Sequence, residues 1–240
     1  MTLATLALAF LLRDEAADAL KQFDAAYKSK DAAARAAAVT ELAKTDHEKV
    51  DARLEKLLLV DAKEIRIAAS AGLGVVRESK DRNKKVMAAL TKAIVPNYAE
   101  RSVILAIVEA LDKFGENVGL SILHQHFSSP DLPVSKAAVE AATEIRRKES
   151  VPVLIAFAKY LETSARDASN VGPNGRAVTG GGLPYVGGNT AGDPEAPKRA
   201  RTLSPVVTKA LESITKKAFK TTPEWEAWWK KEGSDFKVEK

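Results

Sequence analysis

Apolar side chains recur at helical spacing along most of the chain. In residues 47–59 the apolar positions Val50, Leu54, Leu57 and Leu58 are spaced i, i+4, i+7 and i+8, which places them on one face of a helix. No long run alternates apolar and polar residues with the period of two that a strand requires. The pattern therefore predicts an all-α protein.

The amphipathic segments come in pairs. The first member of each pair has small residues near its middle and an apolar residue about one turn later. These first members are residues 31–45, 62–77, 99–115 and 132–148. The second members are residues 47–59, 81–94, 116–127 and 151–161. Each pair is predicted to form a helical hairpin.

The hairpins repeat at a regular distance. The late apolar positions of the first members are Leu42, Leu73, Leu111 and Ala142, at steps of 31, 38 and 31 residues, and Leu211 follows 69 residues later. A period in the thirties is typical of helix-turn-helix repeats, which bury their apolar faces by stacking on one another. We therefore expect an α-solenoid of about five hairpins. Small residues should lie where helices approach closely; the candidates are Ala36, Ala37, Ala38, Ala68, Ala69, Ala137, Ala138, Ala141 and Ala142.

Prolines and capping residues mark the expected helix ends. A capping residue followed closely by proline predicts a helix start, and the candidate pairs are Asp131 and Pro133, Ser204 and Pro205, and Thr222 and Pro223. Pro96, Pro130 and Pro152 should lie between helices or in a first turn. Gly115 fits a helix C-terminus.

Two first members carry the same short motif. Arg35-x-Ala37-Ala38 and Arg66-x-Ala68-Ala69 are each followed by a leucine, Leu42 or Leu73, and this resembles the first-helix signature of the HEAT-repeat family. The third segment departs from it with Ile104, and the fourth has Ser135 for the arginine and Ala142 for the leucine. The resemblance covers residues 28–168, and 204–230 more loosely. It implies a scaffold for protein interactions and no catalytic residue.

The C-terminal segment 211–233 resembles the closing part of many bacterial HEAT-repeat proteins, which ends in a short tryptophan-rich helix. Trp225 is three and four residues from Trp228 and Trp229, so one helix face is aromatic. We expect this face to cap the last hairpin, because terminal repeats need a seal. An exposed aromatic docking site is the alternative.

Residues 169–203 interrupt the helical pattern with eight of the 13 glycines and four of the 10 prolines. This composition predicts a long flexible loop that contacts a partner. Leu183 and Tyr185 supply apolar contacts there, and Lys198, Arg199 and Arg201 form a basic group before the last hairpin. The glycine run at 180–182 is followed by Leu-Pro and lacks the Lys-Ser or Lys-Thr pair of a phosphate-binding loop.

The N-terminus carries an apolar run ten residues long, Leu3 to Leu12, within residues 1–20. This run is too short to span a bilayer, but it fits the apolar core of a secretory signal peptide. No lysine or arginine precedes it. Export to the periplasm or the extracellular space is one expectation. The alternative is a cytoplasmic protein in which the run begins a first helix that continues through Leu20 and Phe23.

The expected organisation is therefore residues 1–20 as a signal peptide or first helix and 21–168 as HEAT-like repeats. The flexible insertion spans 169–203, the last hairpin and cap 204–233, and a tail 234–240.

Residues suited to catalysis or metal binding are sparse. The chain has no cysteine, which excludes disulfides and thiolate chemistry. His124 and His126 are two residues apart on a helix and therefore cannot chelate one metal together. Ser213 and Lys216 match a serine–lysine spacing but lack its companion motifs. We expect no catalytic site, no metal and no cofactor.

The charge is only mildly basic, with 37 lysines and arginines against 32 acidic residues and a formal charge of +5. Second helices line the concave face in HEAT-like stacks, so their basic residues could form a groove. These are Arg53, Lys56, Lys84, Lys85, Lys92 and Lys159. Interleaved acidic residues such as Glu48 and Glu55 favour a solvated face instead.

These observations predict a non-enzymatic scaffold that binds a protein partner through its concave face, the 169–203 loop, or both. The alternative is nucleic-acid binding in a basic concave groove, with affinity that falls steeply with salt. A role as an enzyme accessory or lyase is a third reading, and no nucleophile or acid pair supports it.

Overall fold

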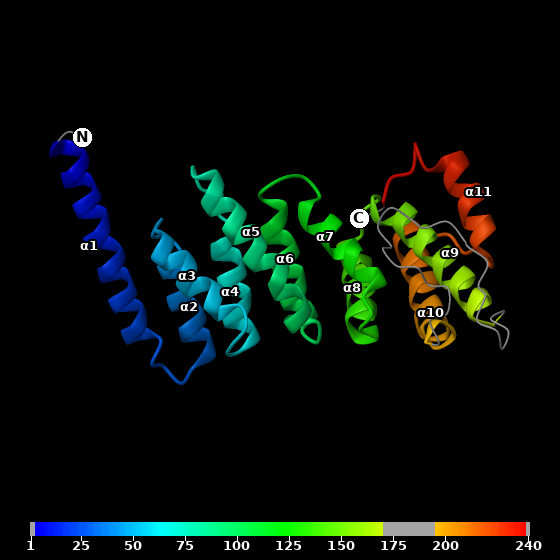
Figure 1. Cartoon of the computed structure of the whole chain (residues 1–240), viewed down its shortest axis with the longest axis horizontal. Helices are drawn as coiled ribbons and strands as arrows, with labels where there is room; N and C mark the ends of the chain where they lie inside the picture. The colour runs from blue at the N-terminus through cyan, green and yellow to red at the C-terminus, as the bar shows by residue number, and fades with distance from the viewer. Residues whose placement is uncertain (1–2, 170–194, 239–240) are drawn as a thin grey trace. The chain divides into compact units, whose positions relative to one another are not determined.

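A computed structural model describes the backbone of residues 3–169 and 195–238 and the side chains of residues 15–168 and 195–238. Within these residues the protein is all-α, with eleven α-helices and two short 3-10 helices (Figure 1). The chain divides into two compact units, residues 1–119 and residues 120–240. Each unit is described by itself below.

The first unit contains α1 to α6 and the start of α7. Their bounds are α1 Leu3–Ala26, α2 Ala32–Leu42, α3 Glu48–Leu57, α4 Lys63–Leu73, α5 Lys80–Ile94, η1 Val95–Asn97, α6 Arg101–Asp112 and α7 Val118–Gln125. The expected first helices pack side by side, with α2 against α4 and α4 against α6. The second helices α3 and α5 also contact each other. Helix α1 packs on α2 and α3.

The second unit follows a similar plan. It contains the rest of α7, η2 His126–Ser128, α8 Leu132–Ile145, α9 Ser150–Ser169, α10 Ala196–Thr215 and α11 Thr222–Glu232. Helix α8 packs against α10, and α9 packs against both α10 and α11. The helices expected from the sequence are therefore all present, with ends within a few residues of the predicted ones, except where α9 and α10 run further.

Glycines and alanines lie at the close approaches. A Cβ atom added to Gly72 would lie 2.6 Å from the Cβ of Ala43, and one added to Gly74 would lie 2.9 Å from the Cα of Ala110. The sequence Gly72-Leu73-Gly74 therefore permits close packing of α4. Of the predicted close-approach alanines, Ala69, Ala138, Ala141 and Ala142 are buried, whereas Ala37 is exposed.

Several predicted helix starts are confirmed. The side chain of Asp131 accepts from the Val134 N–H at 3.4 Å at the start of α8, with Pro133 in the first turn. Pro96 lies in η1, and Pro152 lies in the first turn of α9. Gly115 follows α6 by three residues, in the turn that leads to α7.

One predicted start is wrong. Ser204 and Pro205 do not begin a helix, because α10 already begins at Ala196 and Pro205 lies inside it. Residues 196–203 are therefore helical and do not belong to a loop. The buried face of α10 runs on through Ala196, Ala200, Leu203 and Val207, and its packing outweighs the hydrogen bond that proline cannot donate.

Helix α11 is capped one residue earlier than expected. Thr221 is the capping residue, and the Glu224 carboxylate accepts from the N–H groups of Thr221 at 3.1 Å and Lys220 at 2.8 Å. These bonds lower the pKa of Glu224. The hydroxyl of Thr222 instead donates to Glu162 of α9 at 2.5 Å. Thr222 thus joins two helices instead of capping one.

Helix α1 is continuous from Leu3 to Ala26, and within the described part of the chain no helix is both long and apolar enough to cross a membrane. Phe23 is buried and its ring lies 4.8 Å from that of Tyr27. Export through residues 1–20 stays a prediction.

Candidate functional site

The predicted basic residues of the first unit differ in their surroundings. Arg53 forms an ion pair with Asp24 at 2.7 Å and lies 5.1 Å from the centre of the Phe23 ring. It therefore fastens α3 to α1. Lys56, Lys85 and Lys92 are exposed. Burial raises the pKa of the Glu55 carboxyl, while the positive charges of Lys85 and Lys92 act in the opposite direction.

Most of the predicted basic residues of the second unit are engaged within it. Lys159 of α9 pairs with Glu226 of α11 at 2.8 Å, and Lys198 pairs with Glu195 one turn away at 2.9 Å. Arg199 donates to the carbonyl oxygens of Ser129 at 2.6 Å and Pro130 at 2.9 Å, which ties α10 to the turn before α8.

Arg201 is exposed. Leu183 and Tyr185 lie outside the described residues. Among the described residues, some of the predicted basic side chains therefore join helices of the same unit and the others are exposed.

The two arginines of the repeated motif have matching positions. Arg35 of α2 donates to Asp61 Oδ1 at 2.7 Å, in the turn before α4. Arg66 of α4 donates to Asn97 Oδ1 at 2.6 Å, in the turn before α6. Each arginine thus reaches from a first helix to the turn that begins the next hairpin. At the corresponding positions of α6 and α8, Ile104 and Ser135 are buried.

The turn at Asp61 is built around that carboxylate. Asp61 has a left-handed backbone, with φ at 73°, and it also accepts from the Tyr27 hydroxyl at 2.5 Å. This bond and the one from Arg35 lower the pKa of Asp61. Burial, followed by the bond to Asp61, raises the pKa of Tyr27 to about 12. The phenol therefore stays protonated at neutral pH and acts as a structural donor.

A buried ionic cluster, which was not predicted from the sequence, lies near the start of α3 and the end of α4. Asp51 of α3 accepts from Arg77 at 3.2 Å and from Arg82 at 2.6 Å, and its side chain is 7% exposed. Asp46 pairs with the same two arginines at 3.2 and 2.9 Å. The cluster joins α3 to the turn after α4 and to α5. Its acidic and basic members are 26 to 36 residues apart, so no local sequence pattern predicts their pairing.

One rim of the first unit exposes large apolar side chains. Leu59 and Val60 follow α3, and Val95 and Tyr98 lie in and after η1, with exposed fractions of 39 to 57%. The Asn97 side-chain amide donates to the Leu58 carbonyl at 2.9 Å, which holds the two turns together. We call these four residues the apolar rim.

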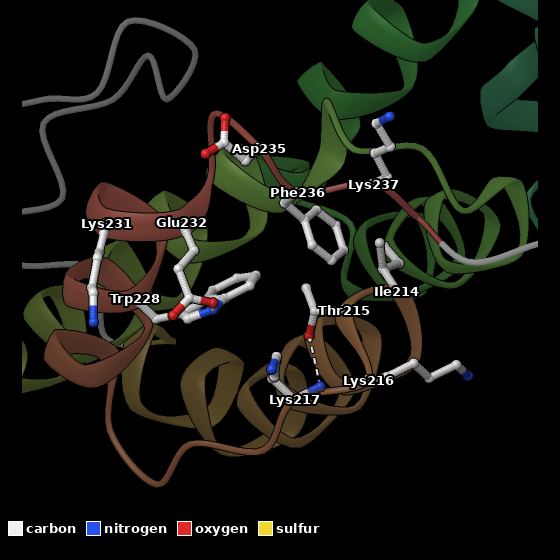
Figure 2. A pocket seen from close by; sticks show the side chains of 10 residues that line it. All are labelled: Ile214, Thr215, Lys216, Lys217, Trp228, Lys231, Glu232, Asp235, Phe236 and Lys237. Atoms are coloured by element: carbon white, nitrogen blue, oxygen red, sulfur yellow. Dashed lines mark hydrogen bonds between the residues drawn. The ribbon is translucent and has the colours of Figure 1, made fainter.

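A second feature is an open cavity of about 540 Å³ in the second unit (Figure 2). It lies between the end of α10, α11 and the segment after α11. The rings of Trp228 and Phe236 line one side, with centroids 5.5 Å apart. Its other lining residues are Ile214, Thr215, Lys216, Lys217, Lys231, Glu232, Asp235 and Lys237. We call it the lysine pocket.

The lysine pocket rests on an aromatic cluster that confirms the predicted tryptophan-rich C-terminus. Trp225 and Trp228 are 3% and 7% exposed, and Phe219 contacts both rings. The Trp228 indole donates to Glu232 at 2.8 Å, and Lys148 donates to the Ser234 carbonyl at 2.7 Å. Burial of two of the three tryptophans favours packing over an exposed aromatic docking site.

One serine–histidine pair is close enough for proton transfer. His124 Nε2 lies 3.0 Å from Ser150 Oγ, but Ser150 is fully buried and His124 nearly so. Burial lowers the pKa of His124 to about 4, and it also lowers that of His126. A buried pair with a weak base has no access to a substrate, so it serves packing. No group of acidic and histidine side chains within the described residues could hold a metal ion.

Comparisons with known proteins add no family assignment. No known family model matches the chain, and neither a characterised protein nor a solved structure is significantly similar to it. The inference of function therefore rests on the residues and their geometry.

Proposed function

We propose that this protein is a non-enzymatic interaction scaffold of HEAT-like hairpins that binds a partner protein through the apolar rim. The observation that carries the proposal is the exposure of Leu59, Val60, Val95 and Tyr98 on two turns joined by Asn97. Contiguous exposed apolar side chains on a folded unit are typical of protein-binding sites. Side-by-side packing of α2, α4 and α6 supports the HEAT-like arrangement.

The rim suits a protein surface that is itself apolar at its centre. Exposed Lys56 and Lys92 lie within about a turn of it in sequence, and the acidic residues Glu64 and Glu100 do as well. Because charges of both signs surround the apolar rim, they discriminate only weakly between partner proteins. Burial of the four apolar side chains therefore supplies most of the binding free energy. An aromatic residue such as Tyr98 is a frequent energetic centre of such contacts.

The basic residues give less support to the nucleic-acid alternative. Arg53, Lys159, Lys198 and Arg199 are held by carboxylates or carbonyls of the same chain. Phosphate binding would have to compete with these bonds.

Site-specific photo-crosslinking in the native host tests the proposal. A photoreactive phenylalanine analogue replaces Leu59 or Tyr98 in turn, and the matched control places it at Val76, which is equally exposed at the other end of α4. We expect one discrete crosslinked protein from both rim positions and not from Val76. That protein, once purified, should bind the unmodified chain and lose affinity at least tenfold for Tyr98→Asp.

The same crosslinked protein at Val76 as at the rim would contradict the assignment of the surface. Absence of any crosslinked protein at both rim positions, in a chain with wild-type helicity, would contradict the scaffold itself.

A further inference from the structure

The lysine pocket has a surplus of positive charge that no ion pair among the described residues neutralises. Lys216, Lys217, Lys231 and Lys237 are exposed, and none of them has an ion-pair partner among the described residues. The carboxylates of the pocket are two, Glu232 and Asp235, and Glu232 accepts from the Trp228 indole.

The positive charge of the pocket exceeds the negative partial charge of the neighbouring helix ends. Both α10 and α11 end at the pocket, and a helix C-terminus carries about half a negative charge. Two such ends offset about one of the two net positive charges of the four lysines and two carboxylates. The pocket therefore still attracts an anion.

The shape of the pocket indicates which kind of anion. Ile214, Thr215 and Trp228 form its base and are almost fully buried, so the half-buried Phe236 is the one ring of the pocket that a ligand can contact. A nucleic-acid site without sequence preference would present open aromatic faces to successive bases. A small-molecule site would enclose most of its ligand, whereas the edge of the lysine pocket consists of exposed lysines. Several carboxylates on an extended chain match these lysines better.

We propose that the lysine pocket binds an acidic peptide segment of a partner protein, with an apolar side chain of that segment on Phe236. The lysine stems add apolar contact beside the ring while their ammonium groups reach the carboxylates. This inference rests on the proposed scaffold function and adds a second contact of defined chemistry to it.

Intrinsic fluorescence reports on this pocket directly, because all three tryptophans of the chain belong to the aromatic cluster. The full chain is titrated with a synthetic peptide of glutamates around one central leucine. A peptide with glutamine in place of glutamate is the matched probe. We expect saturable binding of the acidic peptide only, weakening as salt rises.

Charge reversal locates the site. The variant Lys217→Glu/Lys237→Glu alters two pocket lysines outside the helices, so the fold should be unaffected. The control Arg201→Glu/Lys209→Glu makes the same change in net charge on the exposed side of α10. We expect the dissociation constant for the acidic peptide to rise about tenfold in the pocket variant and less than twofold in the control.

An equal loss in both variants would show attraction to net charge alone and would overturn the proposal. So would wild-type protein that fails to bind the acidic peptide, or that binds a single-stranded oligonucleotide more tightly at equal probe charge. These measurements need no partner protein, so the pocket can fail while crosslinking at the apolar rim succeeds, and the reverse.

Discussion

Beyond the aliphatic core that both units share, the most buried contacts between helices differ in kind between the two units. In residues 1–119 the joins between hairpins are polar, with Arg35 on Asp61, Arg66 on Asn97 and two arginines on Asp51. In residues 120–240 the last helices meet in a cluster of five aromatic rings. Polar joins are directional and fix a spacing at each turn, whereas buried rings contribute more free energy at one place.

The difference leads to an expectation about how stability is distributed. In the second unit a few large side chains should account for much of the free energy of unfolding. In the first unit most single joins should matter less, except where a charge is fully buried. Tryptophan fluorescence reports only the second unit, while far-UV circular dichroism reports helices of both. The two signals can therefore assign each loss of stability to a unit.

Replacing Trp225 should have the largest effect. Trp225→Ala removes a ring that is 3% exposed and that contacts Phe219 and Trp228, so we expect a loss of about 4 kcal/mol. Urea unfolding followed by the fluorescence of the two remaining tryptophans measures it. Trp229→Ala is the control, because Trp229 is only half-buried and should cost less than half as much. Equal losses would contradict the central place of Trp225.

Asp51 is the exception among the polar joins. Asp51→Ala leaves Arg77, whose side chain is 3% exposed, without its buried partner, and we expect a loss of about 3 kcal/mol. Asp46→Ala removes a carboxylate that is 63% exposed and contacts the same arginines, so its effect should stay below about 1 kcal/mol.

Circular dichroism during urea unfolding should show the loss in Asp51→Ala, with the fluorescence transition unchanged. A fluorescence midpoint that moves as far as the circular dichroism midpoint would contradict the assignment of this cluster to the first unit alone.

The second unit should lose stability in mild acid because of His124. Its pKa is about 4 in the folded protein and 6.5 when unfolded, so below pH 6.5 the unfolded chain binds more protons and stability falls as the pH falls. The loss should reach about 2 kcal/mol at pH 5 and level off below pH 4. His124→Gln should remove most of this slope between pH 7 and 5, measured by fluorescence-detected unfolding. His126, whose pKa is also lowered by burial, should account for the remainder. An unchanged slope would contradict the role of His124.

The helices were predictable because each has a strong local signal. Apolar residues at helical spacing identified the helical pairs, and the shared spacing of Arg35 and Arg66 pointed to a repeated role. The start of α10 differs from the predicted one, because the apolar spacing that positions this helix continues through Pro205. Helix α8 ends at Arg146 and α10 at Lys216, both in the left-handed conformation that glycine usually adopts. Without glycine at these positions, the sequence does not predict where the two helices end.

The candidate sites were less predictable, because they depend on distant partners. Arg53 and Arg199 looked free in the sequence, but Asp24 and the carbonyls before α8 take up their donors. The apolar rim consists of short turn segments whose exposure only the packing of α3 and α5 determines. The lysine pocket combines residues from two helix ends and the following segment.

The smallest expected effect separates the two equivalent arginines. Arg66→Ala leaves the buried Oδ1 of Asn97 without its donor, so we expect a loss of about 1 to 2 kcal/mol in the stability of the first unit. Arg35→Ala should cost less, because Asp61 is partly exposed and keeps its bonds from the Tyr27 hydroxyl and the Ala62 N–H. Circular dichroism during urea unfolding ranks the two variants. If Arg35→Ala costs as much as Arg66→Ala, the burial of the acceptor does not determine how much each arginine stabilises the first unit. The matching positions of the two arginines would then explain their equal contributions.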